Sequence, residues 1–289
     1  MLAYLGQPVL LDDLLYGSDN SLVSQSVAPG LMSLLNIGGF GLVAWDSESR
    51  TRDVPFTYRT PGVPVFDRNL KALATKVHAT AAVAHVRGVL YDPGESVGPH
   101  NLHPFQFPGA RIALAQNGDL FGFSQMRYDL IDHVRPELAQ MIEGTTDTEW
   151  VYALLLSQLA DPFGPAEPDE LADAILQTLA VLRETRERRG ITTQSPVNLI
   201  VTDGDSIVAT RFSFDYGWYP DDGSFFSNER EFDFTTLWCA PGPDGRSACI
   251  ASEPLTIDRS KWIEAPEYSM IVVRTGQDGI ELETRELVA

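Results

Sequence analysis

The sequence predicts an α+β fold in which strands and helices are segregated along the chain. Short apolar runs typical of strands fill the first half, with clear examples at residues 39–46, 81–87 and 111–116. Two amphipathic helices follow, and the last third returns to strand-like runs. Because the two kinds of element do not alternate regularly, we expect a layered α+β arrangement and not a chain of βαβ units.

The two helices are predicted in the middle of the chain. Residues 146–149 fit a capping box with Thr146 as the N-cap, and the helix is expected to run through Leu159. Pro168 opens the second helix, in which apolar residues recur every three or four positions. Gly190 follows a cluster of arginines and ends that helix.

Strand patterns also begin and end the chain. The first residues predict a buried strand, and residues 216–231 predict a loop that serves as a lid or contact surface. The Asn117-Gly118 pair is a strong turn signal, so we expect a hairpin that joins residues 111–116 to a strand at 121–123. The later strands are predicted at residues 198–201, 207–212, 234–240, 248–252, 270–274 and 280–284.

Composition narrows the class of protein. A formal net charge of −19, from 40 acidic and 21 basic residues, argues against a nucleic-acid partner because phosphate backbones would be repelled. The sequence contains no apolar run long enough for a membrane span, and its start does not resemble a secretion signal. Two cysteines are too few for a disulfide framework, so a cytoplasmic protein is expected.

Motifs for metals and cofactors are weak. No glycine-rich phosphate loop, His-x-x-x-His pair or Gly-x-Ser-x-Gly elbow occurs. His100 and His103 are close in sequence, but no third ligand is evident beside them. We therefore predict neither a cofactor nor a metal site.

Three small groups of residues could carry chemistry, and each has a structural alternative. Arg87 ends an apolar strand, where a guanidinium can grip a carboxylate or simply form a salt bridge at the rim. Asn117 and Gly118 offer the side-chain amide and backbone N–H groups of an oxyanion hole, or a hairpin turn. Asp147 at a helix start could bind a substrate ammonium, or only stabilise the helix dipole.

Several longer segments occur in a characteristic order with these residues. They are Leu2-Ala3-Tyr4-Leu5-Gly6, Ser24-Gln25-Ser26-Val27-Ala28-Pro29, Asn36-Ile37-Gly38-Gly39-Phe40-Gly41, Ala84-His85-Val86-Arg87, Asn101-Leu102-His103-Pro104-Phe105, Asn117-Gly118, Gly144-Thr145-Thr146-Asp147-Thr148-Glu149 and Ala251-Ser252-Glu253-Pro254-Leu255. As an ordered set they resemble the class II glutamine amidotransferases, particularly the stand-alone members of the EgtC and YafJ type.

This resemblance implies a single domain over residues 1–289 with the four-layer αββα sandwich of the Ntn hydrolases. It also implies amide hydrolysis through a thioester on an N-terminal cysteine, whose own α-amino group serves as the base. Arg87 would bind the α-carboxylate of a small-molecule substrate and Asp147 its α-ammonium, while Asn117 and Gly118 would hold the oxyanion. Glutamine and a γ-glutamyl amide both fit, and a homo-oligomer or a synthase partner would be compatible.

The sequence departs from the family pattern at its start. Family members begin Met-Cys-Arg, and Met1 aligns with the residue after these three, so the nucleophile is expected just before Met1. Gly38 stands where aspartate is usual and Gln116 where histidine is common. One explanation is a displaced start. Whichever explanation holds, we expect the 289-residue chain as given to lack glutaminase activity. The others are a non-catalytic Ntn-fold subunit that binds a ligand or partner, and a metal or nucleotide enzyme on the same scaffold.

Overall fold

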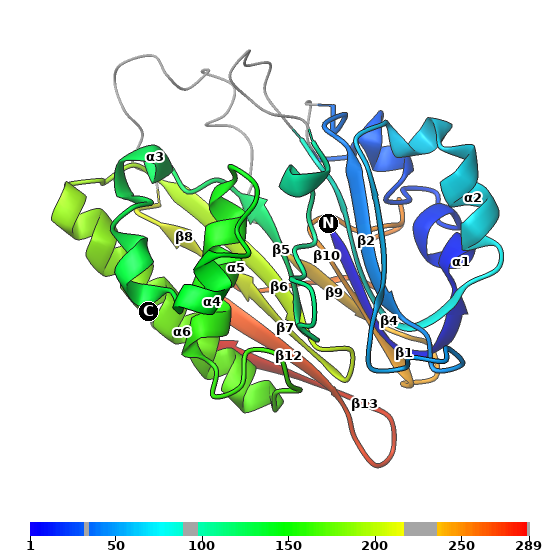
Figure 1. Cartoon of the computed structure of the whole chain (residues 1–289). Coiled ribbons are helices and arrows are strands. Elements are labelled where there is room, and N and C mark those ends of the chain that lie inside the picture. The colour runs from blue at the N-terminus through cyan, green and yellow to red at the C-terminus, as the bar shows by residue number, and fades with distance from the viewer. Residues whose placement is uncertain (32–34, 89–97, 217–235, 288–289) are drawn as a thin grey trace.

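The computed structural model describes residues 1–31, 35–88, 98–216 and 236–287. Within these residues, two antiparallel sheets face one another, and helices cover the outer face of each sheet (Figure 1). The order of layers is helix, sheet, sheet, helix. This confirms the predicted α+β class and the layered αββα sandwich.

The first sheet has the strand order β11-β9-β10-β1-β4-β2-β3, so the strand that begins the chain lies in its middle. Leu2 is buried on the helical side of this strand and Ala3 and Leu5 are buried between the sheets, so the first half of β1 is covered on both faces, as its central place requires. The strands are β1 (Leu2–Leu10), β2 (Phe40–Trp45), β3 (Phe56–Thr60), β4 (His78–Val86), β9 (Trp238–Pro241), β10 (Ser247–Ala251) and β11 (Ile263–Glu264).

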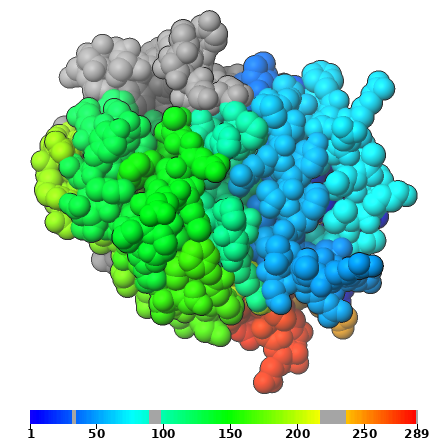
Figure 2. Space-filling view, viewed as in Figure 1, coloured from blue at the N-terminus to red at the C-terminus, as the bar shows by residue number. Residues whose placement is uncertain are grey.

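The second sheet has the order β13-β12-β7-β6-β5, with β8 paired to β6 outside this path. The β12–β13 hairpin protrudes beyond the sandwich (Figure 1, Figure 2). The strands are β5 (Ala113–Gly118), β6 (Ser195–Thr202), β7 (Ser206–Arg211), β8 (Ser213–Phe214), β12 (Ser269–Thr275) and β13 (Ile280–Glu286).

The two predicted helices are confirmed and cover the second sheet (Figure 1). Thr146 caps α5 (Asp147–Gln158) by accepting a hydrogen bond from the backbone N–H of Glu149 at 3.4 Å. Gly190, with a φ of +67°, ends α6 (Pro168–Arg189). The sequence did not predict the shorter elements α1 (Leu11–Tyr16), α2 (Arg68–Ala74), α3 (Phe123–Met126), α4 (Pro136–Ala139), η1 (Ser24–Ser26), η2 (Pro64–Phe66), η3 (Pro99–Asn101) and η4 (Leu130–His133).

The space between the two sheets is filled by a mixture of small and large apolar side chains. Ala3 and Ala81 from the first sheet meet Ala113, Ala115 and Ala209 from the second in one buried cluster, which also contains larger residues such as Trp45 and Ile200. Separate clusters lie under α5 and α6 and under α1 and α2.

The predicted hairpin at Asn117-Gly118 is wrong. Both residues belong to β5 and pair with β6, Asn117 opposite Asn198 and Gly118 opposite Val197. After the strand the chain enters α3 (Phe123–Met126) and does not return as a strand. The physical reason is that β6, distant in sequence, supplies the hydrogen-bonding partner that a local hairpin would otherwise provide.

Two other predictions fall at the limits of the described chain. The predicted strand at 234–240 is described from residue 236, and its strand portion begins at Trp238. Of the predicted loop at 216–231, only Tyr216 belongs to the described residues. Among the helices that the structure describes, none is long and apolar enough to span a bilayer.

Candidate active site

The start of β1 is held by the strands on either side of it. Leu2 pairs with Ala84 of β4 and with Ala251 of β10. Beyond this pair, the Met1 α-amine donates to Ser252 Oγ at 3.0 Å, and the Met1 carbonyl accepts from the Ser252 N–H at 3.0 Å. Burial lowers the pKa of this amine from 8.0 to about 6, while the nearby Glu253 acts in the opposite direction.

Arg87 directly follows β4 and continues its pairing with the segment before β2. Its N–H donates to the Gly39 carbonyl at 2.9 Å, and its carbonyl accepts from the Gly38 N–H at 2.8 Å. Alternation along the strand places Arg87 on the same face as His85 and Val83, which is the face between the sheets. The side chain is only 7% exposed, so Arg87 is a buried cation and not a residue at the rim.

A pair of stacked imidazoles connects the two sheets at this end. The rings of His85 and His103 lie 4.6 Å apart, and His103 Nδ1 lies 3.0 Å from the carbonyl oxygen of Gln116 in β5. The Gln116 N–H also lies 3.4 Å from Nδ1, so this nitrogen donates to the carbonyl in one tautomer and accepts from the N–H in the other. Burial and the Arg87 guanidinium lower the pKa of His103 to about 3, and burial also lowers the pKa of His85. Both rings are therefore neutral at neutral pH.

The end of β5 carries the predicted oxyanion hole. Asn117 shares its face of the strand with Ala113 and Ala115, which pack between the sheets, so its side chain is on the same inter-sheet face as Arg87. Gly118 has a φ of +127°, and a Cβ at this position would lie 1.9 Å from the Pro196 carbonyl oxygen. Only glycine fits there, and its backbone N–H ends the strand beside Asn117.

Asp147 lies on the other side of β5. It is the first residue of α5, and its carboxylate accepts hydrogen bonds from the Leu120 N–H at 2.7 Å and from Gln116 Nε2 at 3.3 Å. The N–H and hydroxyl of Thr148 donate to its second oxygen at 2.7 and 3.2 Å. Burial raises the pKa of Asp147, and these four hydrogen bonds oppose the shift.

The structure therefore brings Arg87 and Asn117 to one face, and it joins Asp147 to them only indirectly. Gln116 points toward the helical layer because it alternates with Asn117 along β5. It contacts Asp147 through its side chain and His103 through its backbone. The connection from β4 to α5 thus passes through His85, His103 and Gln116.

Several supporting residues were missed as functional by the sequence reasoning, although they lie in the segments that carry the resemblance. Glu253 accepts hydrogen bonds from Asn20 Nδ2 and from the N–H groups of Gly30 and Leu31 at 2.9–3.0 Å. It thereby fixes the loop beside the first strand. Asn101 exchanges hydrogen bonds with the backbone and hydroxyl of Thr145 at 2.8 and 3.0 Å, which positions the start of α5.

The glutamate of the predicted capping box acts differently from the expected pattern. A capping box requires the Glu149 side chain to reach back to the Thr146 N–H. Instead, the Glu149 carboxylate accepts from the N–H groups of Glu143 at 3.0 Å and Gly144 at 2.6 Å. It therefore stabilises the turn before α5, between Asn101 and the helix.

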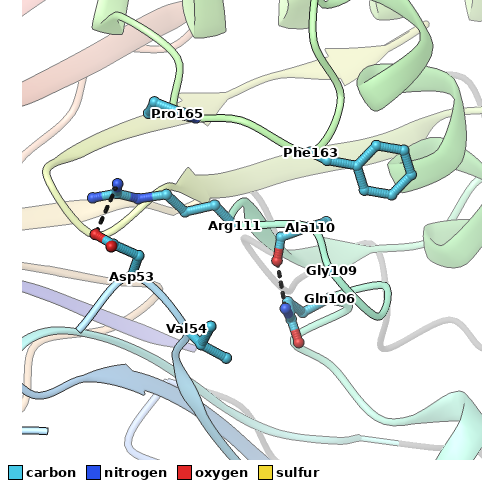
Figure 3. Close-up of a pocket in the computed structure, with 8 residues that line it drawn as sticks. All are labelled: Asp53, Val54, Gln106, Gly109, Ala110, Arg111, Phe163 and Pro165. Carbon is cyan, nitrogen blue, oxygen red and sulfur yellow. Dashed lines mark hydrogen bonds and ion pairs between the residues drawn. The ribbon is translucent and has the colours of Figure 1, made fainter. Parts of the chain in front are cut away.

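A pocket of about 420 Å³ lies at the opposite end of β5 (Figure 3). Arg111, which precedes the strand, crosses this pocket and donates from Nε to the Asp203 carbonyl at 2.9 Å. Its Nη1 lies 3.5 Å from an Asp53 oxygen. None of the predicted site residues lines this pocket. Its lining consists of Asp53, Val54, Gln106, Gly109, Ala110, Arg111, Phe163 and Pro165.

The two cysteines are poor nucleophiles where they stand. Burial raises the pKa of Cys239, and it raises the pKa of Cys249 to about 12, so both remain thiols at neutral pH. In the part of the chain that the structure describes, no group of three or more His, Cys, Asp or Glu side chains is arranged to hold a metal ion.

Comparison with known families decides the identity of the fold. The family model described as "Glutamine amidotransferases class-II" matches residues 68–287. The chain belongs to the class II glutamine amidotransferases. It is also similar to the "Probable glutamine amidotransferase DUG3" of Saccharomyces cerevisiae, with 26% identity over 294 residues. The alignment covers 93% of this chain and 79% of that protein.

Solved structures show the same fold. A class II glutamine aminotransferase domain protein from Silicibacter pomeroyi aligns with a TM-score of 0.65 and 21% identity, covering 100% of this chain and 99% of that one. The glutamine phosphoribosylpyrophosphate amidotransferase of Bacillus subtilis aligns with a TM-score of 0.59 and 17% identity, covering 98% of this chain and 48% of that one. The predicted family and fold are confirmed. The single-domain organisation, the EgtC and YafJ type and the cytoplasmic location stay predictions.

Proposed function

We propose that this fold hydrolyses the side-chain amide of glutamine or of a γ-glutamyl compound, with the nucleophile supplied by a cysteine two residues before Met1. The strand register is the observation that carries the proposal. Leu2 pairs with Ala84, so Met1 lies across from His85, and a strand continued by two residues would bring its first residue across from Arg87. Alternation would aim that side chain at the inter-sheet face, where Met1 already packs.

The proposed reaction uses the cysteine as both nucleophile and base. Its α-amine, with an ordinary pKa of about 8, takes the thiol proton, and the sulfur attacks the amide carbon. Asn117 Nδ2 and the Gly118 N–H stabilise the oxyanion of the tetrahedral intermediate. The protonated amine then gives its proton to the leaving nitrogen, which departs as ammonia from glutamine or as the corresponding amine from a substituted γ-glutamyl amide, and water hydrolyses the thioester to release the carboxylate product.

Substrate binding is assigned to two charged residues. Arg87 is a buried guanidinium on the inter-sheet face, and a buried cation at a strand end is suited to a bidentate bond with an α-carboxylate. Asp147 supplies the negative charge for the α-ammonium from the start of α5, where the N–H of Leu120, two residues after β5, holds its carboxylate. The stacked His85 and His103 stay neutral, so they add no charge that would compete with either ion.

The deciding experiment restores the proposed nucleophile. The chain is produced with Met-Cys-Arg before Met1, alongside a matched protein with Met-Ser-Arg, and ammonia release from glutamine and from γ-glutamyl amides is measured. We expect turnover only in the cysteine form, with Asn117→Ala lowering it by about 10²–10³-fold. Equal activity, or equal inactivity, of the cysteine and serine forms would rule out the proposed nucleophile.

A non-catalytic, ligand-binding subunit is the second candidate. It is favoured by the buried Arg87, which offers a carboxylate site that needs no thiol, and by the high pKa of both cysteines. Calorimetry of the 289-residue chain with glutamate tests this role. Binding should disappear in Arg87→Ala and persist in Arg111→Ala, whose arginine lies at the opposite end of β5. Equal binding by both variants would remove Arg87 from the site.

A further inference from the structure

Gln116 is buried at the junction of the two sheets and α5. Its side chain and backbone are only 1% exposed, and both are engaged. Nε2 donates to Asp147 at 3.3 Å, and the carbonyl oxygen lies 3.0 Å from His103 Nδ1. Oε1 lies 3.3 Å from the Thr148 hydroxyl, whose one proton is shared with Asp147 Oδ1. The residue after it is Asn117, so Gln116 contacts Asp147 and adjoins Asn117, which are two parts of the proposed site.

We infer that Gln116 is a positioning residue that orients the Asp147 carboxylate and thereby sets the preference for ligands that carry a free α-amino group. This inference rests on the proposed function, because it deepens the role of Asp147 in that site. It concerns recognition of the amine and not the chemical step, since Gln116 points to the helical layer and not to the inter-sheet face.

The hydrogen bonds around Asp147 support this role. The Leu120 N–H and Gln116 Nε2 donate to Oδ2 of Asp147, and the Thr148 N–H donates to Oδ1. The Thr148 hydroxyl has one proton, which it gives either to Oδ1 or to Gln116 Oε1, so the four acceptor positions of the carboxylate are not all filled at once. Thr148 is on the same helix as Asp147, whereas Leu120 and Gln116 approach from the β5 side, Leu120 through its backbone and Gln116 through its side chain. The orientation of the carboxylate relative to β5 therefore depends on both residues, and Gln116 supplies the contribution that a side-chain substitution can remove.

The length of the Gln116 bond explains how Asp147 can still accept a ligand. At 3.3 Å from a neutral amide, this is a long hydrogen bond, whereas an ammonium forms shorter and stronger ones with a carboxylate. An α-ammonium can therefore share Oδ2 with Gln116. Removing the amide would leave Oδ2 held only by the Leu120 N–H, which loosens the orientation of the carboxylate, and it would also take away a donor that favours its ionised form.

The test compares two ligands that differ only in the α-amine. In the Met-Cys-Arg protein, Gln116→Leu should raise the KM for glutamine about tenfold, as expected for one lost hydrogen bond to a charged group, and should leave kcat within about twofold. The KM for glutaramate, which lacks the amine, should not change. The acidic limb of the glutamine KM profile should also move to higher pH.

Two outcomes would overturn the inference. An equal rise in KM for both ligands would mean a general structural defect. A lower KM for glutamine would mean that the Gln116 amide competes with the substrate amine. Gln158→Leu is the matched control, because Gln158 lies on α5 and donates to the Leu154 carbonyl at 3.1 Å, away from Asp147. It should alter neither KM.

Further variants distinguish an effect on ligand recognition from simple misfolding. Thr148→Val removes the hydroxyl that holds Gln116 Oε1 and should cause a smaller loss of discrimination in the same direction. Gln116→His keeps an N–H donor and should retain more discrimination than Gln116→Leu. If the Gln116 and Thr148 variants all lose their cooperative thermal transition, the residue is purely structural and the inference fails.

Failure of the inference can be separated from failure of the proposed function. An active Met-Cys-Arg protein whose ligand preference is unchanged by Gln116→Leu would reject the inference alone. If that protein has no hydrolase activity, the proposed function fails, and calorimetry with glutamate and glutarate then applies the same amine comparison to binding. Absence of glutamate binding would reject both.

Discussion

The imidazole rings of His85 and His103 stack with centroids 4.6 Å apart and planes inclined at 33°. His85 belongs to β4 of the first sheet, whereas His103 bonds the Gln116 carbonyl in β5 of the second. The ring pair therefore links the two sheets through His103, a residue between the strands, at the end where the proposed site lies. Because both rings are buried and neutral, protonation at low pH should destabilise this contact between the layers.

We predict that stability falls with pH in a way that depends on His103. Its pKa is about 3 in the folded protein and 6.5 ordinarily, so the unfolded chain takes up the proton first as the pH falls below 6.5. Stability is then lost between these two values, by about 1.4 kcal/mol per pH unit for this group. The His103→Asn variant lacks this group. Between about pH 6 and pH 4, where the linkage acts, its unfolding free energy should therefore fall less steeply, by about 1.4 kcal/mol per pH unit.

The control for this measurement is His78→Asn, because His78 lies exposed at the start of β4. Urea unfolding at each pH gives the free energies for both variants and the parent chain. A slope in His103→Asn equal to that of the parent would mean that the ring is not kept neutral by the fold.

We predict that Gly41→Ala is strongly destabilising. A Cβ on Gly41 in β2 would lie 2.1 Å from the His103 carbonyl oxygen, and backbone cannot easily move away. The expected loss is at least about 2 kcal/mol, typical of overpacking. Gly190→Ala is the control: its φ is +67°, but nothing lies within 4 Å of the added carbon. It should cost only about 1 kcal/mol of left-handed strain. Equal losses would show that the close approach at Gly41 is not limiting.

Glu253→Gln should destabilise the loop beside β1. The carboxylate accepts hydrogen bonds from Gly30, Leu31 and Asn20, whereas an amide has only one acceptor oxygen and would turn a donor toward one of these N–H groups. We expect a loss of about 1.5–3 kcal/mol in the free energy of unfolding, the range for hydrogen bonds to a charged group. Glu48→Gln, at an exposed position, should change it little. A neutral result at Glu253 would mean that water replaces the carboxylate.

Local signals predicted the parts of the fold that depend on nearby residues. Thr146 and Gly190 mark helix ends through contacts within a few positions, and both were identified correctly. Asn117-Gly118 was interpreted as a turn because the sequence gives no sign that β6, some eighty residues later, pairs with it. The helices α1 and α2 are too short to show a clear apolar period, so they were missed.

The site was predictable in part for the same reason. Arg87, Asn117 and Asp147 stood out because each occupies a strand end or helix start. The roles of His103 and Gln116 depend on which face of β5 each residue meets and on contacts between separate layers. The available signal was that Gln116 stands where histidine is common, and only the three-dimensional arrangement gave its side chain a partner.

The alternation of Gln116 and Asn117 along β5 has an evolutionary consequence. These two consecutive residues place their side chains on opposite faces of the strand. Gln116 lies beside the Asp147 carboxylate of α5, and Asn117 lies on the face between the sheets. Under the roles proposed above, a point mutation at Gln116 would change which ligands are bound without altering the groups that stabilise the oxyanion. Ligand selectivity and reactivity would then be inherited separately, although the two residues proposed to carry them are joined by a single peptide bond.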